Sequence, residues 1–212
     1  MKPALDGQPP TGMLRDGSAA RTESIRWAAF VEINVNQFHD TPLAVPGLFV
    51  RHLGFEDIDL LQALLEKSSD YSLLVTGLPP AASAAYSLLT DLPEGKTPSD
   101  KLVVGFFAEK QNLIGVLDII RDYPSQGVWW LRLLILDPEY RGQGLGQRIY
   151  SAFEKWVTQC GGHRVCLGVI EQNQDAYRFW QKVGFEPLER KPAKHFGNAE
   201  HVVTTMARKL TD

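Results

Sequence analysis

The sequence lacks the features that commit a chain to a membrane, to export or to a nucleic-acid partner. Its long apolar runs are interrupted by charge, by Asp118 in one and by Arg132 in another, and none is long enough to span a bilayer. Residues 1–17 lack the apolar core of a secretory signal peptide. The formal net charge of −3 gives no electrostatic reason to expect nucleic acid or an anionic membrane as a partner. We therefore expect a cytoplasmic protein that binds neither nucleic acid nor membranes.

Cysteine and histidine are also scarce. The two cysteines, Cys160 and Cys166, are too few for a disulfide framework or a cysteine-rich metal site, and we expect both to be reduced thiols in the core. The five histidines are scattered along the chain without the spacing of metal ligands. The sequence therefore predicts no metal cofactor.

The length and composition fit one globular domain behind a short extension. A hydrophobic fraction of 44% over 212 residues is enough for one well-packed core. Residues 1–24 are rich in glycine, proline and alanine and show no period, which indicates a flexible segment, whereas residues 25–35 have the apolar spacing of one helix face. We expect a partly flexible N-terminal extension over residues 1–47 and one domain over residues 48–212.

Hydrophobic periodicity predicts an α/β fold. Apolar residues recur at helical spacing from Leu145 to Cys160, and Val128 to Leu136 is nearly all apolar, as expected for a central strand buried on both faces. Residues 110–112 are expected to form a hairpin turn, whereas residues 71–78 show no clear period. We predict strands at residues 48–53, 101–109, 113–120, 128–136, 164–170, 185–190 and 202–206, and helices at residues 57–65, 81–89, 145–160 and 173–183.

A glycine-dense loop between a predicted strand and the longest predicted helix is the strongest functional signal. Gly142, Gly144 and Gly146 alternate there, and glycine lets the backbone approach a bound anion closely. The free N–H groups of a helix's first turn and the helix dipole favour negative charge, and Arg141 adds a positive side chain. The loop suits a pyrophosphate. It is not a P-loop, which ends in Gly-Lys-Ser/Thr, and it does not have the G-x-G-x-x-G spacing of the dinucleotide fingerprint.

Two blocks of the sequence resemble the GNAT acetyltransferases. Residues 141–146 match the Q/R-x-x-G-x-G/A motif of that family, and residues 134–138, L-x-L-x-P, resemble the strand before it. Residues 173–185, N-x-x-A-x-x-F-W-x-x-x-G-F, resemble a later block of the family. The resemblance covers roughly residues 100–190 and implies the GNAT fold. That fold is a mixed, mostly antiparallel sheet of about six to seven strands flanked by four or so helices, with a parallel strand pair splayed at the cofactor site.

The resemblance also implies an acetyl-CoA-dependent N-acetyltransferase in which an amine attacks the thioester directly, in a ternary complex. Acetyl-CoA would lie between the strands 128–136 and 164–170. Backbone groups of Leu134 and Leu136 would pair with its pantetheine arm, and Asn173 would reach it from the other wall. The implied cofactor-binding residues are Leu134, Ile135, Leu136, Arg141, Gly142, Gln143, Gly144, Leu145, Gly146, Asn173 and Trp180.

The sequence departs from the family pattern at Trp180, where the family often has a tyrosine that can protonate the leaving sulfur. An indole N–H cannot act as a general acid. Trp180 continues the buried stripe of its predicted helix, so either core packing or shaping of the cofactor channel fits it. Tyr177, one turn earlier, is a substitute donor or a surface residue.

The general base is not marked by the family pattern either, because the strand before the glycine loop carries no carboxylate. Asp118 is the candidate base, since it interrupts an apolar strand that should lie beside the cofactor strand. The alternative is that Asp118 sits on the solvent face of that strand. A chain of water molecules could also accept the proton without any single base.

The acceptor is expected to be a small-molecule or peptide amine, and the sequence does not specify it. The sequence leaves the oligomeric state open, and a homodimer is possible. A rival interpretation is an acetyl-CoA-binding sensor or interaction module with little turnover, favoured by the missing tyrosine and strand carboxylate. Transfer of a longer acyl group is a third interpretation.

Overall fold

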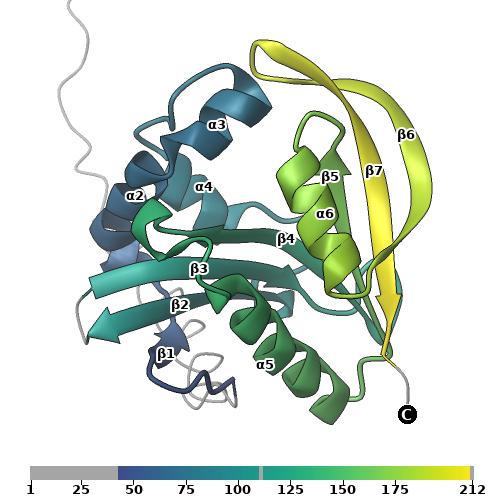
Figure 1. Cartoon of the computed structure of the whole chain (residues 1–212), viewed down its shortest axis with the longest axis horizontal. Helices are drawn as coiled ribbons and strands as arrows, with labels where there is room; N and C mark the ends of the chain where they lie inside the picture. Colours follow the sequence, from purple (N-terminus) through teal and green to yellow (C-terminus); the bar gives the residue numbers. More distant parts are fainter. Residues whose placement is uncertain (1–42, 110–111, 211–212) are drawn as a thin grey trace, which may run out of the picture. The chain divides into compact units, whose positions relative to one another are not determined.

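A computed structural model describes residues 43–109 and 112–210 of the chain (Figure 1). Most of the expected N-terminal extension, including the helix expected at residues 25–35, lies outside the described residues, as do two residues of the hairpin turn expected at 110–112. In the part of the chain that the structure describes, no helix is both long and apolar enough to cross a membrane.

Seven strands form one mixed sheet in the order β1-β2-β3-β4-β5-β7-β6. Within the described residues, β4 and β5 are the only parallel pair, and every other neighbouring pair is antiparallel. This arrangement confirms the predicted fold class. The strands are β1 Phe49–His52, β2 Lys101–Glu109, β3 Asn112–Ile120, β4 Val128–Leu136, β5 Arg164–Ile170, β6 Glu186–Phe196 and β7 Ala199–Lys209.

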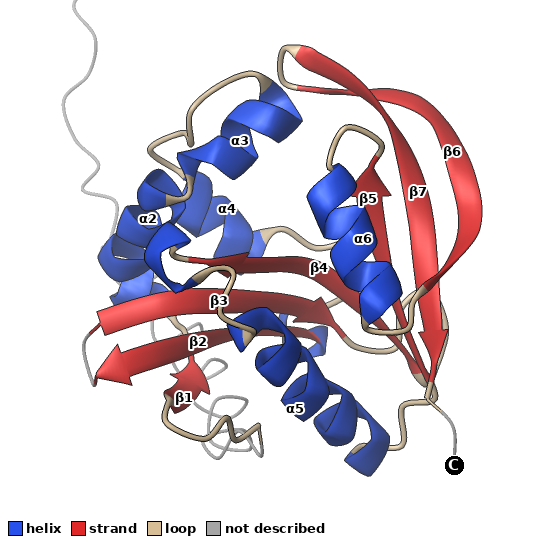
Figure 2. Ribbon diagram, in the orientation of Figure 1, coloured by secondary structure: helices blue, strands red, loops and turns tan. Residues whose placement is uncertain are grey.

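Helices cover both faces of the sheet (Figure 2). α5 and α6 pack on one face, in a core that includes Phe153, Leu167 and Trp180, and α2 and α4 pack on the other, in a core that includes Leu64 and Val116. The α-helices of the described residues are α2 Ile58–Lys67, α3 Ser69–Thr76, α4 Ala84–Thr90, α5 Leu145–Gln159 and α6 Gln174–Lys182; short 3₁₀ turns span η1 Phe55–Asp57, η2 Pro98–Asp100 and η3 Pro138–Tyr140.

Three structural features differ from the predicted elements, and the first two lie where the apolar pattern is weak. α3 was not predicted, because none of its residues is buried and it has no apolar stripe. β6 and β7 are each longer than expected, and almost every side chain of β6 is exposed, so no alternation marks the strand. β4 is buried on both faces only in part, since Leu133, Leu134 and Leu136 are half-buried.

The thiols also differ from the expectation of two core cysteines. Both are free, but Cys160 is exposed and only Cys166 is buried. The buried stripe of α5 ends at Val157, and the helix itself ends at Gln159. Tyr150, which was not expected in that stripe, is buried with it.

The packed part of the chain begins before the boundary expected at residue 48. Leu43 and Val45 are 2% and 3% exposed and belong to the core under α5. Because burial removes their side chains from water, these residues contribute to the stability of the domain.

We therefore predict that Leu43→Ala lowers the free energy of unfolding of the full chain by about 2–5 kcal/mol, the usual cost of removing a buried leucine side chain. Leu73→Ala on α3 is the matched control, because Leu73 is 50% exposed and its loss should cost less than about 0.5 kcal/mol. Urea unfolding monitored by tryptophan fluorescence measures both. Equal effects of the two changes would show that Leu43 is not part of the core.

Candidate functional site

The pairing between β4 and β5 ends early. The two parallel strands share only three residue pairs, and Trp130 with Cys166 is the last of them. Beyond that pair, β4 continues to Leu136 beside β3, and β5 continues to Ile170 beside β7. The edge of β4 that faces β5 is therefore unpaired from Leu131 onward. This is the splayed parallel pair that the resemblance implied.

The backbone of β4 beyond the splay is oriented by its pairing with β3. The N–H of Asp137 donates to Ile114 of β3, at 2.9 Å. Because successive residues of an antiparallel strand point their N–H and C=O groups to opposite edges, those of Leu134 and Leu136 point toward β5. The N–H and C=O groups of Ile135 point toward β3 instead. The side chain of Ile135 is buried in the core on the α2 and α4 face of the sheet. The unpaired edge thus offers backbone donors and acceptors, as expected for Leu134.

The glycine loop follows β4 and opens α5. Gly142 and Gly144 have positive φ angles of 74° and 77°, and Gly144 is the residue that precedes α5. A Cβ added at either position would meet nothing within 4 Å, so this backbone faces open space. No described residue accepts a hydrogen bond from the N–H of either glycine or of Gly146. Free donors at the positive end of a helix fit an anion.

Gly146 serves close packing instead. A Cβ added there would lie 3.4 Å from Cζ of Phe179 and 3.8 Å from Cδ1 of Leu136. The first turn of α5 therefore lies against both α6 and the end of β4. Gln143, in the middle of the loop, donates from Nε2 to the carbonyl of Glu139 at 2.9 Å, which holds the loop against the 3₁₀ turn before it.

The guanidinium of Arg141 is bound by two groups of the protein, a backbone carbonyl and a carboxylate. Its Nε donates to the carbonyl of Leu136 at 2.8 Å, and its Nη1 lies 2.5 Å from the carboxylate of Asp70 on α3. The hydrogen bond from Arg141 lowers the pKa of Asp70. Ser68 Oγ also donates to the Leu136 carbonyl, at 3.3 Å. That carbonyl, expected to pair with the cofactor, already has two donors, and Asp70 is a partner that the sequence analysis missed.

The second family block places Asn173 and Trp180 in different surroundings. Asn173 Oδ1 accepts a hydrogen bond from the N–H of Ala176 at 3.1 Å and so caps α6, as predicted. Trp180 is buried in T-shaped contacts with Tyr150 and Phe185, with ring centroids 5.8 and 5.3 Å apart. The packing role expected for Trp180 is present, and a place in the cofactor channel stays a prediction.

Tyr150 is a buried polar residue that the sequence analysis missed. Its side chain is buried, and its hydroxyl has no hydrogen-bond partner among the described residues. Burial raises the pKa of Tyr150 far above its ordinary value, with a smaller contribution from Glu154. The phenol therefore stays protonated.

Asp118 is 2% exposed, so the alternative that it lies on the solvent face of its strand is wrong. Its Oδ1 lies 2.8 Å from Lys101 Nζ, and its Oδ2 lies 3.7 Å from Arg132 Nε. Burial raises the pKa of Asp118, although the two cations act in the opposite direction, and burial lowers the pKa of Lys101. Its role as a base stays a prediction, and Lys101 is a partner that no local sequence pattern marked.

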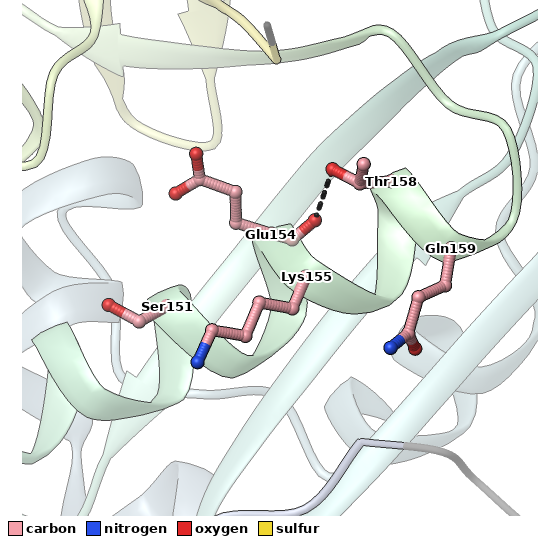
Figure 3. A pocket seen from close by; sticks show the side chains of 5 residues that line it. All are labelled: Ser151, Glu154, Lys155, Thr158 and Gln159. Atoms are coloured by element: carbon pink, nitrogen blue, oxygen red, sulfur yellow. Dashed lines mark hydrogen bonds between the residues drawn. The ribbon is translucent and has the colours of Figure 1, made fainter. Parts of the chain in front are cut away.

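Two pockets lie on the outer face of α5 and not at the splay. The larger has a volume of about 520 Å³ and is lined by Ser151, Glu154, Lys155, Thr158 and Gln159 (Figure 3). Thr158 Oγ1 donates to the carbonyl of Glu154, whose carboxylate pairs with Arg208 at 2.7 Å. The second pocket, of about 480 Å³, extends along α5 to Gly144 and Arg148. Only the second touches the glycine loop, and the two pockets share Ser151 and Lys155.

Within residues 43–109 and 112–210, no group of three or more His, Cys, Asp or Glu side chains is placed to hold a metal ion. His201 is buried and bonds to Gln172 and to the carbonyl of Val75 at 2.8 and 2.9 Å. It therefore links β7 to α3.

Solved structures with the same architecture are numerous. An acetyltransferase from Thermus thermophilus is 22% identical, with a TM-score of 0.63 over 79% of this chain and 99% of that one. The spermidine N-acetyltransferase of Vibrio cholerae, solved with CoA and spermine, is 17% identical, with a TM-score of 0.61 over 77% and 96%. The ribosomal-protein-S18-alanine N-acetyltransferase of Escherichia coli is 14% identical, with a TM-score of 0.56 over 78% and 95%. At these identities the likeness shows the fold.

Sequence comparison gives the family. The curated N-acetyltransferase YobR of Bacillus subtilis (strain 168), itself uncharacterized, is 26% identical over 80 residues, which is 38% of this chain and 30% of that protein. The match therefore spans about a third of that relative. The model of the acetyltransferase (GNAT) family matches residues 71–185, more than half of the chain and including both sequence blocks. The protein belongs to the GNAT family of acetyltransferases.

Proposed function

We propose that this protein transfers the acetyl group of acetyl-CoA to a primary amine by direct attack in a ternary complex. The observation that carries the proposal is the splay of β4 and β5 beside a glycine loop that borders open space at Gly142 and Gly144 and whose glycine N–H groups have no acceptor among the described residues. Membership of the GNAT family supports acetyl transfer. The Vibrio cholerae structure, which contains CoA, supports the choice of cosubstrate.

In this proposal the cosubstrate follows the features of the site in order. Its pyrophosphate binds the N–H groups of residues 142–146, since the N–H expected to contribute from Arg141 already donates to the carbonyl of Pro138 at 3.2 Å. Its pantetheine amides pair with the open edge of β4 at Leu134. Asn173 uses Oδ1 to cap α6, which leaves its amide NH₂ to donate toward the cleft between the strands. The pocket beside Gly144, lined also by Arg148 and Lys155, offers cations for the phosphorylated adenosine end of CoA.

The transfer forms a bond between the amine nitrogen and the acetyl carbon and breaks the bond between that carbon and sulfur. The amine must be neutral to attack, so an ammonium has to give up one proton, to Asp118 or to ordered water. A free backbone N–H at the splay can stabilise the oxyanion. On attack the nitrogen becomes positively charged, and it loses a second proton as the amide forms. That proton goes to the departing CoA thiolate without help from Trp180, whose indole N–H cannot act as a general acid.

A binding module with little turnover is the second candidate. The burial of Trp180 in the aromatic core, where the family often has a tyrosine, favours it. Incubation with acetyl-CoA and a panel of amines separates the two, because only the enzyme releases free CoA thiol at a rate that depends on the amine.

Gly144→Val should abolish CoA binding, with a loss of at least about 100-fold in affinity by calorimetry, because a branched side chain would occupy the space in front of the loop and the positive φ resists it. Gly161→Val is the matched control. Gly161 lies beyond the other end of α5, has a φ of 79° and also has nothing within 4 Å of an added Cβ. Both changes carry the same backbone cost. Equal CoA affinities in the two folded variants would refute the loop assignment.

Trp180→Phe should lower stability by about 1–2 kcal/mol, because a smaller ring leaves space beside Tyr150, and should keep acetyl transfer within a few fold of the wild type. Phe153→Leu, in the same aromatic cluster, controls for lost packing. Thermal unfolding and steady-state thiol release measure the two effects. A fall in kcat of about 1,000-fold or more in a folded Trp180→Phe protein would mean that the indole acts in the reaction.

Asp118→Asn should slow transfer by about 10²–10⁴ if Asp118 is the base. Because burial raises the pKa of Asp118, the wild-type kcat/KM should fall as pH drops through that raised pKa, where the carboxylate becomes protonated. The variant's defect should shrink as pH rises, since the amine then loses its proton unaided.

Lys101→Met is the control for this experiment, because it breaks the same buried pair and keeps the carboxylate. A defect that is constant across pH in both variants would assign the pair a structural role. Wild-type rates in Asp118→Asn at every pH would remove Asp118 from the proton transfer and leave water as the acceptor.

A further inference from the structure

Lys101, Asp118 and Arg132 form an ion cluster in which one cation is partly exposed and the carboxylate is buried. Asp118 lies between Lys101 and Arg132, 2.8 Å and 3.7 Å away. The side chains of Lys101 and Asp118 are 4% and 3% exposed, whereas that of Arg132 is 30% exposed. Lys101 and Asp118 cancel each other within the core. The charge that reaches solvent from this cluster is therefore the guanidinium of Arg132.

The position of Arg132 is set by a β-bulge. Asp118 pairs with Leu133 and Ile119 pairs with Leu131, so Arg132 is the extra residue on β4. It also follows Trp130, the last β4 residue that pairs with β5, by two positions. Arg132 therefore stands where the two parallel strands begin to diverge.

The guanidinium is held in place but not saturated. Its Nη1 donates to the carbonyl of Asp91, at the end of α4, and its Nε faces Asp118. Among the residues that the structure describes, none accepts a hydrogen bond from Nη2. An arginine fixed on one side, with free N–H groups on the other, is preorganised to bind a carboxylate.

Other charges around the opening add to this cation. Lys191 of β6 places Nζ 5.9 Å from the ring centroid of Trp130, which lies on the same face of the sheet as Asp118. Three carboxylates of the neighbouring elements are already paired: Glu171 with Arg190, Asp70 with Arg141, and Asp137 with Lys67. Glu189, two positions before Lys191 on β6, is exposed to solvent, which screens its charge. The carboxylate of Asp91 is exposed and forms no ion pair with Lys101 or Arg132 among the described residues. Its charge still acts to raise the pKa of Lys101 and of Asp118, as the last of the causes for each, so it offsets part of the positive charge here, and solvent screens the remainder.

We propose that Arg132 is the anion subsite of the acceptor site, and that the acceptor is a small amine that also carries a carboxylate, such as an amino acid or a short peptide. This inference rests on the proposed acetyl transfer. The carboxylate binds the free edge of Arg132, and the amine is directed into the splay. Nearby cations favour the neutral form of an amine over the ammonium, so the same charges that hold the acceptor also promote loss of its proton. A polyamine would meet repulsion at this place.

The test compares a dipeptide that has a free C-terminal carboxylate with its C-terminal amide, and both with spermidine. Calorimetry with protein saturated with CoA measures binding without turnover, and thiol release from acetyl-CoA measures transfer. Wild-type protein should prefer the carboxylate form about 10- to 100-fold, mainly through KM. Arg132→Gln should remove that preference and change the amide less than about 3-fold. Arg132→Lys should restore part of it.

Arg178→Gln is the matched control, since it removes one exposed arginine from the outer face of α6 and should leave the preference intact. Equal use of the dipeptide and its amide by the wild type, or a preference for spermidine, would overturn the inference, and neither result needs a variant to fold. Absence of carboxylate-dependent binding in calorimetry would also overturn it. If Arg132-dependent binding occurs but no amine releases thiol, the subsite stands and acetyl transfer fails.

Discussion

The early end of the parallel pairing between β4 and β5 is the constraint on which the rest of the site depends. A parallel pair needs a crossover connection, which here is the glycine loop followed by α5, so the end of β4 and the first turn of α5 meet at one place. If the pairing continued to Leu136, the β4 edge would be bonded to β5. Because it stops at Trp130 and Cys166, the open edge and the free N–H groups of the loop share one opening.

Polar contacts add to the packing of one side chain, Tyr71, in holding α3 beside that opening. Tyr71 packs against the core on the α2 and α4 face of the sheet. No residue of α3 is buried. The helix is bonded to the glycine loop through Asp70 and Arg141, and to the β6–β7 hairpin through the carbonyls of Val75 and Thr76, the latter accepting from the N–H of Asn198 at 2.8 Å (Figure 1). A segment with few buried apolar contacts has low local stability. The position of α3 is thus tied to the state of the loop that Arg141 belongs to.

Charge is distributed unevenly between the two faces of the sheet. The face under α5 and α6 is packed with aromatic rings around Trp180 and Tyr150, whereas the face toward α2 and α4 contains the buried pair of Lys101 and Asp118. A buried ion pair costs desolvation energy that well-packed apolar residues would not. The pair lies next to the β4 bulge, and the bulge residue Arg132 completes the same ion cluster.

The sequence alone determined the features that are local. The glycine loop, the Asn173 cap and the periodicity of α5 depend on residues within a few positions of one another, and the family motifs contain the same residues, so the fold and the cofactor loop could be predicted. Tertiary structure decided the partners: Asp70 lies 71 positions before Arg141, and Lys101 lies 17 positions before Asp118. Neither pairing produces a periodic pattern in the sequence from which it could have been predicted. Burial of Asp118 and the bulge at Arg132 likewise depend on how β3 registers against β4, which only the folded sheet sets.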